Sequence, residues 1–294
     1  MNRSAPQTDE PGRFAAFLHR CREAVCDAPV PAQIGMAVIL AYTFVVILAP
    51  VLAPYGESEV FPESFAPWSG EFRFGTDNIG RDILTRLIYG TRNTVLISLI
   101  TTLLAFAIGV SLGTLAALAP RWLDQALSRL VDILMAIPSL IFALMLLSVF
   151  GAGLVNIVLI IAVLDATRVF RLTRAVAMNV AVMDYVEVAR LRGENRAWIA
   201  RKEILPNILP YLFAEFGFRF CFVFLTISAL SFLGVGIQPP TADLGSMVRE
   251  NASLITYGEI TPLLPAAAIA LLTIAVNFVV DWALKQTSGL KDDQ

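Results

Sequence analysis

The stretch that decides the fold is DYVEVARLRGENRAWIARKEILP, residues Asp184–Pro206, a charged segment between two strongly apolar blocks. Five Lys or Arg residues and several acidic residues are interleaved along it. Apolar residues recur at helical spacing in its first half, at Tyr185, Val188, Ala189 and Leu191. Gly193 then offers a stop or a bend. The pattern predicts a short amphipathic helix, which either docks onto a partner or belongs to a basic loop that only fixes orientation.

The composition around this stretch is that of an integral membrane protein. The chain of 294 residues is 57% hydrophobic and only 16% charged, whereas soluble domains are about 25% charged. The apolar residues are concentrated in long runs, as transmembrane helices require. No basic block suggests nucleic acid as a partner, and three Cys and one His form no framework for a metal site. We therefore expect neither nucleic acid nor metal binding.

The apolar runs predict an all-α protein with six transmembrane helices. These helices are expected near residues 34–52, 93–120, 127–150, 154–175, 204–236 and 262–280. Residues 1–30 are expected to form a polar tail with a short amphipathic helix near 14–25, residues 31–285 the transmembrane domain, and residues 286–294 a second polar tail. Gly109 and Gly113, four residues apart, predict a close approach between two helices.

The distribution of basic residues predicts the orientation in the membrane. With the first tail inside, most of the 22 Lys and Arg residues fall in segments that are then cytoplasmic, including those of 184–206. The outer segments hold only Arg73, Arg81, Arg86, Arg92 and Arg249. This bias predicts that both termini and the 184–206 segment are cytoplasmic.

The outer segment 57–92 is expected to contain an amphipathic helix, with Asp77 as its N-cap and Gly90 at its end. The helix either lies along the membrane surface or packs on the end of the bundle. Asp77, Arg81 and Asp82 resemble a reactive cluster on paper. We interpret them as capping and surface charges of this helix.

Two pairs of charged residues interrupt predicted membrane spans. Glu215 and Arg219 are four residues apart in the fifth span, and Asp165 and Arg168 are three apart in the fourth. Charges inside a span normally face the bundle interior or water and are paired. Glu215 and Arg219 therefore either line a polar path for a solute or form an internal ion pair that locks helices. For Asp165 and Arg168 we favour a pair within one helix.

Four segments carry a resemblance to the permease subunits of binding-protein-dependent ABC importers. The central stretch has the spacing of their EAA loop: Glu187-Val188-Ala189, three residues, Gly193, and then Leu205-Pro206 after the usual interval. Val188 replaces an alanine, and Glu203 stands where isoleucine is usual. Three further segments are similar to the second permease of the dipeptide, oligopeptide and nickel group: FGTDNIGRD (residues 74–82), VDILMAIPSL (131–140) and LSFLGVGIQPPTADLG (230–245).

This resemblance implies a fold and a set of partners. The fold would be that of a type I ABC importer permease in the bacterial inner membrane. The partners would be a homologous permease subunit in a heterodimer, two cytoplasmic ATPase subunits and an extracytoplasmic solute-binding protein. The chain itself has no GxxxxGK[ST] motif. ATP and Mg would therefore bind to the partner ATPases, and this chain would hold no cofactor and would not be an enzyme.

The resemblance also implies roles for named residues. The central segment would be the coupling helix that sits in a groove of an ATPase, with contacts from Tyr185, Glu187, Val188, Ala189, Leu191 and Gly193. Asp77, Arg81 and Asp82 would lie near the docking place of the solute-binding protein. The expected cargo is a di- or oligopeptide or a peptide-like solute. Two alternatives stay open: a nickel or metal-chelate importer, and, in another class, an ion-coupled secondary transporter.

Overall fold

The computed structural model describes residues 28–288, and the predicted amphipathic helix near 14–25 lies outside them. The regular secondary structure of the described part of the chain is helical, apart from one isolated bridge between Thr76 and Asp82. Its long helices are α2 (Val30–Leu52), α3 (Ile83–Leu118), α4 (Arg121–Ala136), α5 (Ser139–Phe150), α6 (Leu154–Ala181), α9 (Leu205–Phe232) and α11 (Leu263–Ser288). Its short elements are α7 (Asp184–Leu191), α8 (Arg196–Ile199), η1 (Ala200–Ile204), α10 (Leu244–Asn251) and η2 (Ala252–Tyr257).

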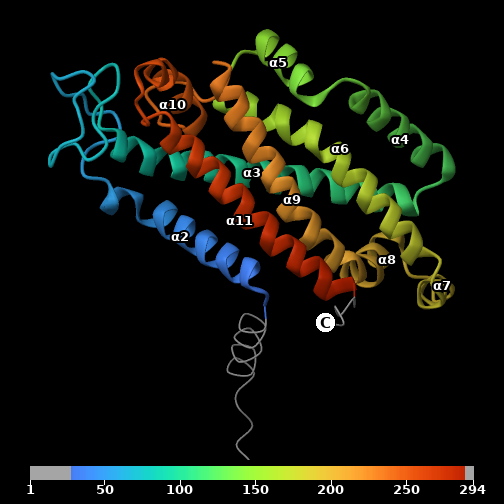
Figure 1. Cartoon of the computed structure of the whole chain (residues 1–294). Helices are drawn as coiled ribbons and strands as arrows, with labels where there is room; N and C mark the ends of the chain where they lie inside the picture. Colours follow the sequence, from blue (N-terminus) through green and yellow to red (C-terminus); the bar gives the residue numbers. More distant parts are fainter. Residues whose placement is uncertain (1–27, 289–294) are drawn as a thin grey trace, which may run out of the picture.

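The helices form one elongated bundle with distinct ends. Figure 1 shows the loop of residues 53–82 and α10 at one end, and α7 and α8 at the other. A Cβ added to Gly109 would lie 2.6 Å from Cβ of Val169, and one added to Gly113 would lie 2.8 Å from Cβ of Thr173. The close helix approach predicted from these two glycines is therefore confirmed, and it joins α3 to α6.

The predicted separate amphipathic helix of the outer segment is wrong. A single helix, α3, runs unbroken from Ile83 through Gly90 to Leu118. Its N-cap is Asp82, whose side chain accepts a hydrogen bond from the backbone N–H of Thr85 at 2.7 Å. Gly90 does not end the helix; an added Cβ there would lie 3.3 Å from the sulfur of Met247, so the missing side chain serves packing against α10.

The predicted third span is bent sharply. α4 and α5 meet at an angle of 87°. Pro138 lies between them, and Ile137 before it is extended, with φ −96° and ψ 133°. Proline disfavours the helical conformation in the residue before it and supplies no N–H, which explains the break at this point. Arg174 of α6 donates to Asp124 of α4, with 2.6 Å between Nη2 and Oδ2.

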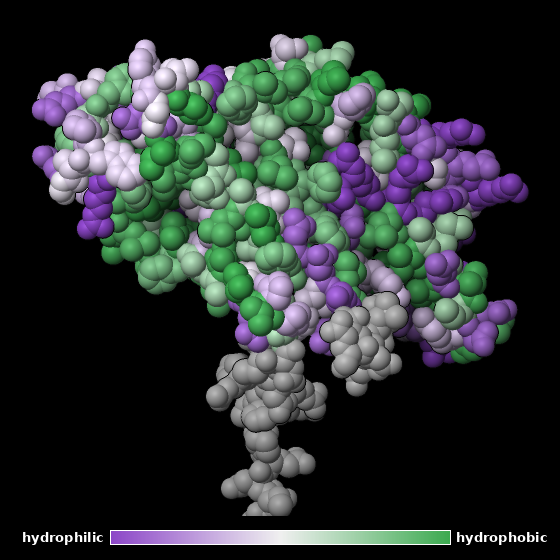
Figure 2. Space-filling model, viewed as in Figure 1, coloured by the Kyte–Doolittle hydropathy of each residue, from purple (hydrophilic) through white to green (hydrophobic). Residues whose placement is uncertain are grey.

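By length and composition, four segments of the described chain could each cross a membrane: α2, α3, the run Arg196–Phe232 that ends in α9, and Leu263–Gln286 of α11. The bent pair α4–α5 would make a fifth. α6 carries four charged residues, Asp165, Arg168, Arg171 and Arg174. Figure 2 shows hydrophobic residues across the middle of the molecule and hydrophilic residues gathered towards its two ends. This distribution is what a bundle that crosses a bilayer requires.

Candidate functional site

One face of α7 packs onto the end of the bundle. Val186 and Ala189 are fully buried. They join an apolar cluster with residues from α6, α8 and α9, among them Ala177, Ile199 and Ile208. Ala189, which the resemblance places among the contacts with an ATPase, therefore lies on the inner face of this helix. Val186 is the second buried residue of this face, and the helical spacing argument did not include it. Its apolar side chain directly after Tyr185 was the signal that could have found it.

The other face of α7 is apolar and exposed. Tyr185 is 41% exposed, Val188 52% and Leu191 82%. Exposed positions three apart on a helix form one stripe, and Glu187 lies exposed beside it. The face is thus a small apolar knob with polar residues around it, positioned at the end of the bundle between α6 and α9.

Gly193 ends α7 in a Schellman motif. Its φ is +83°, in the left-handed region that favours glycine. Its N–H donates to the carbonyl of Arg190 at 2.9 Å, and the N–H of Glu194 donates to the carbonyl of Ala189 at 3.2 Å. The segment then turns into α8, which Asn195 caps through a 2.8 Å hydrogen bond from the N–H of Trp198.

The return to α9 is equally ordered. The guanidinium of Arg192 lies over the ring of Trp198, 5.6 Å from its centroid. η1, one turn of π-helix, follows and passes directly into α9. Single π turns inside helices are often found at functional sites. The segment 184–206 therefore keeps one defined shape between the two helices that it joins.

The two charged pairs that the sequence places in predicted spans meet in one cluster between α6 and α9. Nε of Arg219 lies 2.7 Å from Oε1 of Glu215, and its Nη1 lies 3.4 Å from Oδ1 of Asp165. The same oxygen of Asp165 pairs with Nη1 of Arg168 at 3.2 Å. The ring of Phe222 lies under the Arg219 guanidinium, 4.7 Å away. The cluster has two positive and two negative side chains and joins the two helices.

The sequence predicted each of the two charged pairs, but not that the two pairs contact each other. The prediction of a pair within one helix holds for Asp165 and Arg168, but Asp165 also reaches Arg219 across the helix boundary. Asp165 is 4% exposed, and its Oδ2 has no hydrogen-bond partner in the described part of the chain. Two charged pairs in otherwise apolar runs are the signal that could have predicted such a contact, because buried charges seek further partners.

The predicted outer cluster is buried rather than on the surface. Asp77, Arg81 and Asp82 are 1%, 5% and 3% exposed. Nε of Arg81 lies 2.6 Å from Oδ2 of Asp77, and its Nη2 lies 2.9 Å from Oε2 of Glu250. Arg86 contacts the same two carboxylates at 3.7 and 3.5 Å. The interpretation as surface charges is therefore wrong: Asp77 and Arg81 tie the 53–82 loop to α10, and Asp82 caps α3.

A second polar layer fixes the same end of the bundle. Asp243 caps α10 by accepting from the N–H of Ser246 at 2.8 Å, and its Oδ1 accepts from the hydroxyl of Thr94 at 2.9 Å. Burial raises the pKa of Asp243, while these hydrogen bonds oppose the rise. Glu57 accepts from the N–H of Ala242 at 2.7 Å and from the side chain of Asn93 at 2.9 Å. The 53–82 loop and the segment before α10 are thereby both held on α3.

Within residues 28–288, no group of three or more His, Cys, Asp or Glu side chains could hold a metal ion. The two ends of the bundle differ: an exposed apolar knob at one, and loops fastened by buried charges at the other.

Comparison with known proteins assigns the family. Residues 109–287 match the family described as binding-protein-dependent transport system inner membrane component. A di/tripeptide transport system permease protein, DppC, of Pseudomonas aeruginosa is 35% identical over 265 residues, which cover 88% of this chain and 85% of that protein. The dipeptide transport system permease protein DppC of Haemophilus influenzae is 35% identical over 268 residues, or 89% of this chain and 88% of the relative.

A third relative has a different printed cargo. The glutathione transport system permease protein GsiD of Pectobacterium atrosepticum is 30% identical over 270 residues, covering 90% of this chain and 85% of that protein. All three relatives are named as transport permeases and none as an enzyme. The chain thus belongs to the family of inner membrane components of binding-protein-dependent transport systems, and it is a permease subunit of an ABC importer that works with ATPase and binding-protein partners.

Proposed function

We propose that this chain is one of two homologous but different permease subunits of an ABC importer for di- or oligopeptides or peptide-like solutes. The relatives named for dipeptides, for di- and tripeptides and for glutathione support this cargo class. The observation that carries the proposal is α7: an exposed apolar knob on a helix of fixed shape, at the end of a helical bundle of this family.

In this proposal the chain crosses the membrane six times in the type I importer arrangement. The spans are α2, α3, the bent pair α4–α5, α6, α9 and α11, with both termini cytoplasmic. The excess of Lys and Arg on one side supports this orientation. α7 then lies in the cytoplasm, and the 53–82 loop with α10 lies outside, in keeping with their positions at opposite ends (Figure 1).

Tyr185, Val188 and Leu191 would enter a groove of a partner ATPase, and ATP and Mg would bind to that partner. Glu187 would set the register beside the knob, while Ala189 and Gly193 would hold the shape of the segment. Because α6 leads into it and α9 leaves it, closure of two ATPases would move both helices. A partner can shift the bundle between two states only through different affinities for them.

Glu215 and Arg219, with Asp165 and Arg168, would fasten α6 to α9 so that both helices follow the coupling segment together. The same side chains would border the solute path. Asp77, Arg81 and Asp82 would shape the docking surface for the solute-binding protein from beneath, since their burial leaves them little direct contact.

The test is to isolate the complex through a tag on this chain and to reconstitute it in liposomes. Two ATPase chains and a second, different permease should be isolated together with it. Uptake of a labelled dipeptide should then require both ATP and the solute-binding protein. Purification as a lone carrier, or peptide uptake driven by an ion gradient without ATP, would contradict the proposal.

A further inference from the structure

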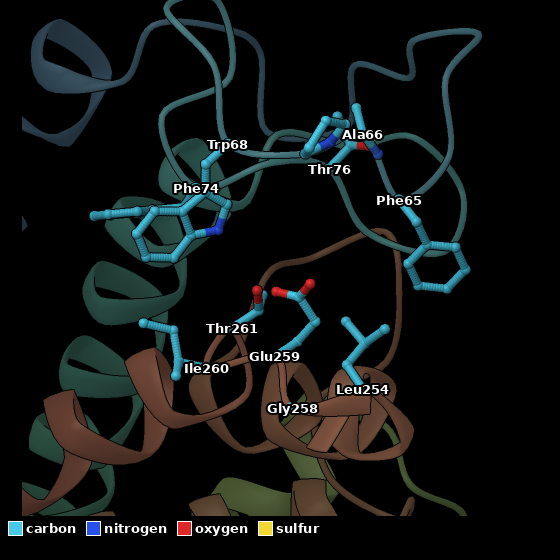
Figure 3. Close-up of a pocket in the computed structure, with 11 residues that line it drawn as sticks. Phe65, Ala66, Trp68, Phe74, Thr76, Leu254, Gly258, Glu259, Ile260 and Thr261 are labelled. Carbon is cyan, nitrogen blue, oxygen red and sulfur yellow. The ribbon is translucent and has the colours of Figure 1, made fainter. Parts of the chain in front are cut away.

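A cavity of about 510 Å³ lies at the end of the bundle opposite α7. It opens between the 53–82 loop and residues 254–261, which follow α10. Figure 3 shows Trp68 and Phe74 on one side, Phe65 on the other, and the carboxylate of Glu259 directed into the space between them. Two segments far apart in the sequence thus build one pocket with aromatic walls and an acidic floor.

The pocket is held in shape by the buried charges below it. The N–H of Phe65 donates to the carbonyl of Asp77 at 3.1 Å. The hydroxyl of Thr76 accepts from the N–H of Ala66 at 2.8 Å and donates to the carbonyl of Glu63 at 2.7 Å. Asp77 is itself fixed by Arg81, so the aromatic wall and the buried charged cluster form one unit.

The aromatic residues of the wall have an unusual backbone conformation at Phe65 and a high exposure at Phe65 and Trp68. Phe65 has a φ of +54°, a conformation that non-glycine residues rarely adopt, and it is 50% exposed. Trp68 is 46% exposed and packs edge-on against Phe74, with 5.3 Å between ring centroids. The strained backbone of Phe65 and the exposed rings of Phe65 and Trp68 are not explained by packing of the bundle, and such features concentrate at binding sites.

The charge of the pocket selects a cation. Glu259 is exposed, and no ion pair is formed by its carboxylate among the residues that the structure describes. The lining contains no Lys or Arg. Exposed acidic residues also outnumber basic ones at this end: Glu59, Glu63, Glu71 and Glu259 against Arg73 and Arg249. A carboxylate beside aromatic faces favours an ammonium or guanidinium group.

We propose that this pocket receives a Lys or Arg side chain of the solute-binding protein when that protein docks, an inference that rests on the proposed function. A side chain is favoured over the peptide itself because a free peptide also carries a carboxylate, for which the pocket offers no cationic partner. A Lys or Arg side chain from a folded protein brings only the positive charge. Its apolar stem fits the aromatic walls.

The experiment uses the complete importer in liposomes with its solute-binding protein, and compares Glu259→Gln with the matched control Glu71→Gln. Both are exposed acidic residues at the same end, but only Glu259 lines the pocket. The measurement is the concentration of binding protein that gives half-maximal stimulation of ATP hydrolysis. Glu259→Gln should raise it about tenfold at low salt and by less at high salt, because a charged contact is lost.

The control should change this concentration less than about twofold, as expected for an exposed charge outside a contact. At saturating binding protein, the Glu259→Gln complex should reach the wild-type rate. Equal effects of the two substitutions would overturn the inference while leaving the proposed function intact. So would a rise in the half-saturating peptide concentration at saturating binding protein, because the pocket would then hold the peptide. A wild-type complex that ignores the binding protein at every concentration would instead refute the proposed function itself.

Discussion

Replacing Gly193 by alanine should weaken the coupling between ATP hydrolysis and uptake. Gly193 has a φ of +83°, and a Cβ added there would meet nothing within 4 Å. The cost of the substitution is therefore that of the left-handed backbone alone, about 1–2 kcal/mol for a residue with a side chain. A penalty of this size makes conformations without the Schellman motif about 5- to 30-fold more populated relative to the motif.

The chain supplies a control in Gly151. It has a φ of +86° and a ψ of 150° after α5, and a Cβ added there would likewise meet nothing within 4 Å. This backbone region is essentially restricted to glycine, so Gly151→Ala carries a backbone penalty at least as large as that at Gly193, at a place outside the coupling segment. Gly193→Pro is the stronger variant, because proline cannot adopt a positive φ and also removes the N–H that donates to Arg190.

The assay is peptide uptake per ATP hydrolysed in liposomes that contain equal amounts of assembled complex. Gly193→Ala should lower this ratio several-fold and Gly193→Pro further, whereas Gly151→Ala should retain it. If both alanine variants gave the wild-type ratio, or if both lowered it equally, the shape of the 184–206 segment would not be what couples hydrolysis to uptake.

Three further predictions concern the α7 surface, the charged cluster between α6 and α9, and the end of the bundle around Glu250. Val188→Asp should lower the amount of ATPase that is isolated with the complex, without lowering the melting temperature of the complex. Ala189→Asp should lower that melting temperature. The two differ because an unpaired charge is costly only at the buried position. Arg219→Gln should lower stability by roughly 3–5 kcal/mol, because the half-buried Glu215 loses its ion pair and Asp165 keeps only Arg168. Adding Glu215→Gln should restore part of this stability, as thermal unfolding of the two variants would show. Uptake normalised to protein level then reports any role of the cluster in the solute path. Glu250→Gln should raise amide hydrogen exchange in the 53–82 loop and α10, because the carboxylate that pairs with Arg81 and Arg86 is lost. Exchange in α7 should stay unchanged. An equal rise in exchange at both ends of the bundle would contradict a role of Glu250 at its own end alone.

The helical architecture follows from the sequence because apolar runs and small-residue spacing are local signals. Gly109 and Gly113 predicted a close contact, and the structure shows it against α6. The spacing of the 184–206 segment predicted a short amphipathic helix ended at Gly193, which the structure also shows. These features depend on residues a few positions apart, and sequence reasoning reaches that far.

Features that depend on distant residues were not predictable in the same way. In the sequence, Asp77 looks like an N-cap. In the structure, Arg86 of α3 contacts Asp77, and Glu250, far along the chain, contacts both Arg81 and Arg86. These contacts make Asp77 part of a buried network. Gly90 looks like a helix end, yet α10 packs against it and the helix continues. The pocket around Glu259 is formed by two loops that no local pattern connects.

The central claim, that α7 meets the ATPase, can be tested by cross-linking in the assembled importer. Leu191 is 82% exposed at the α7 end, and Tyr257 is 81% exposed at the opposite end. In a chain whose three native cysteines are replaced by serine, Leu191→Cys should form a cross-link to an ATPase subunit with a short reagent that has one thiol-reactive end and one photoreactive end, which needs no cysteine on the ATPase. Tyr257→Cys should form none. A cross-link from Tyr257→Cys, or none from Leu191→Cys in an intact and active complex, would contradict the account.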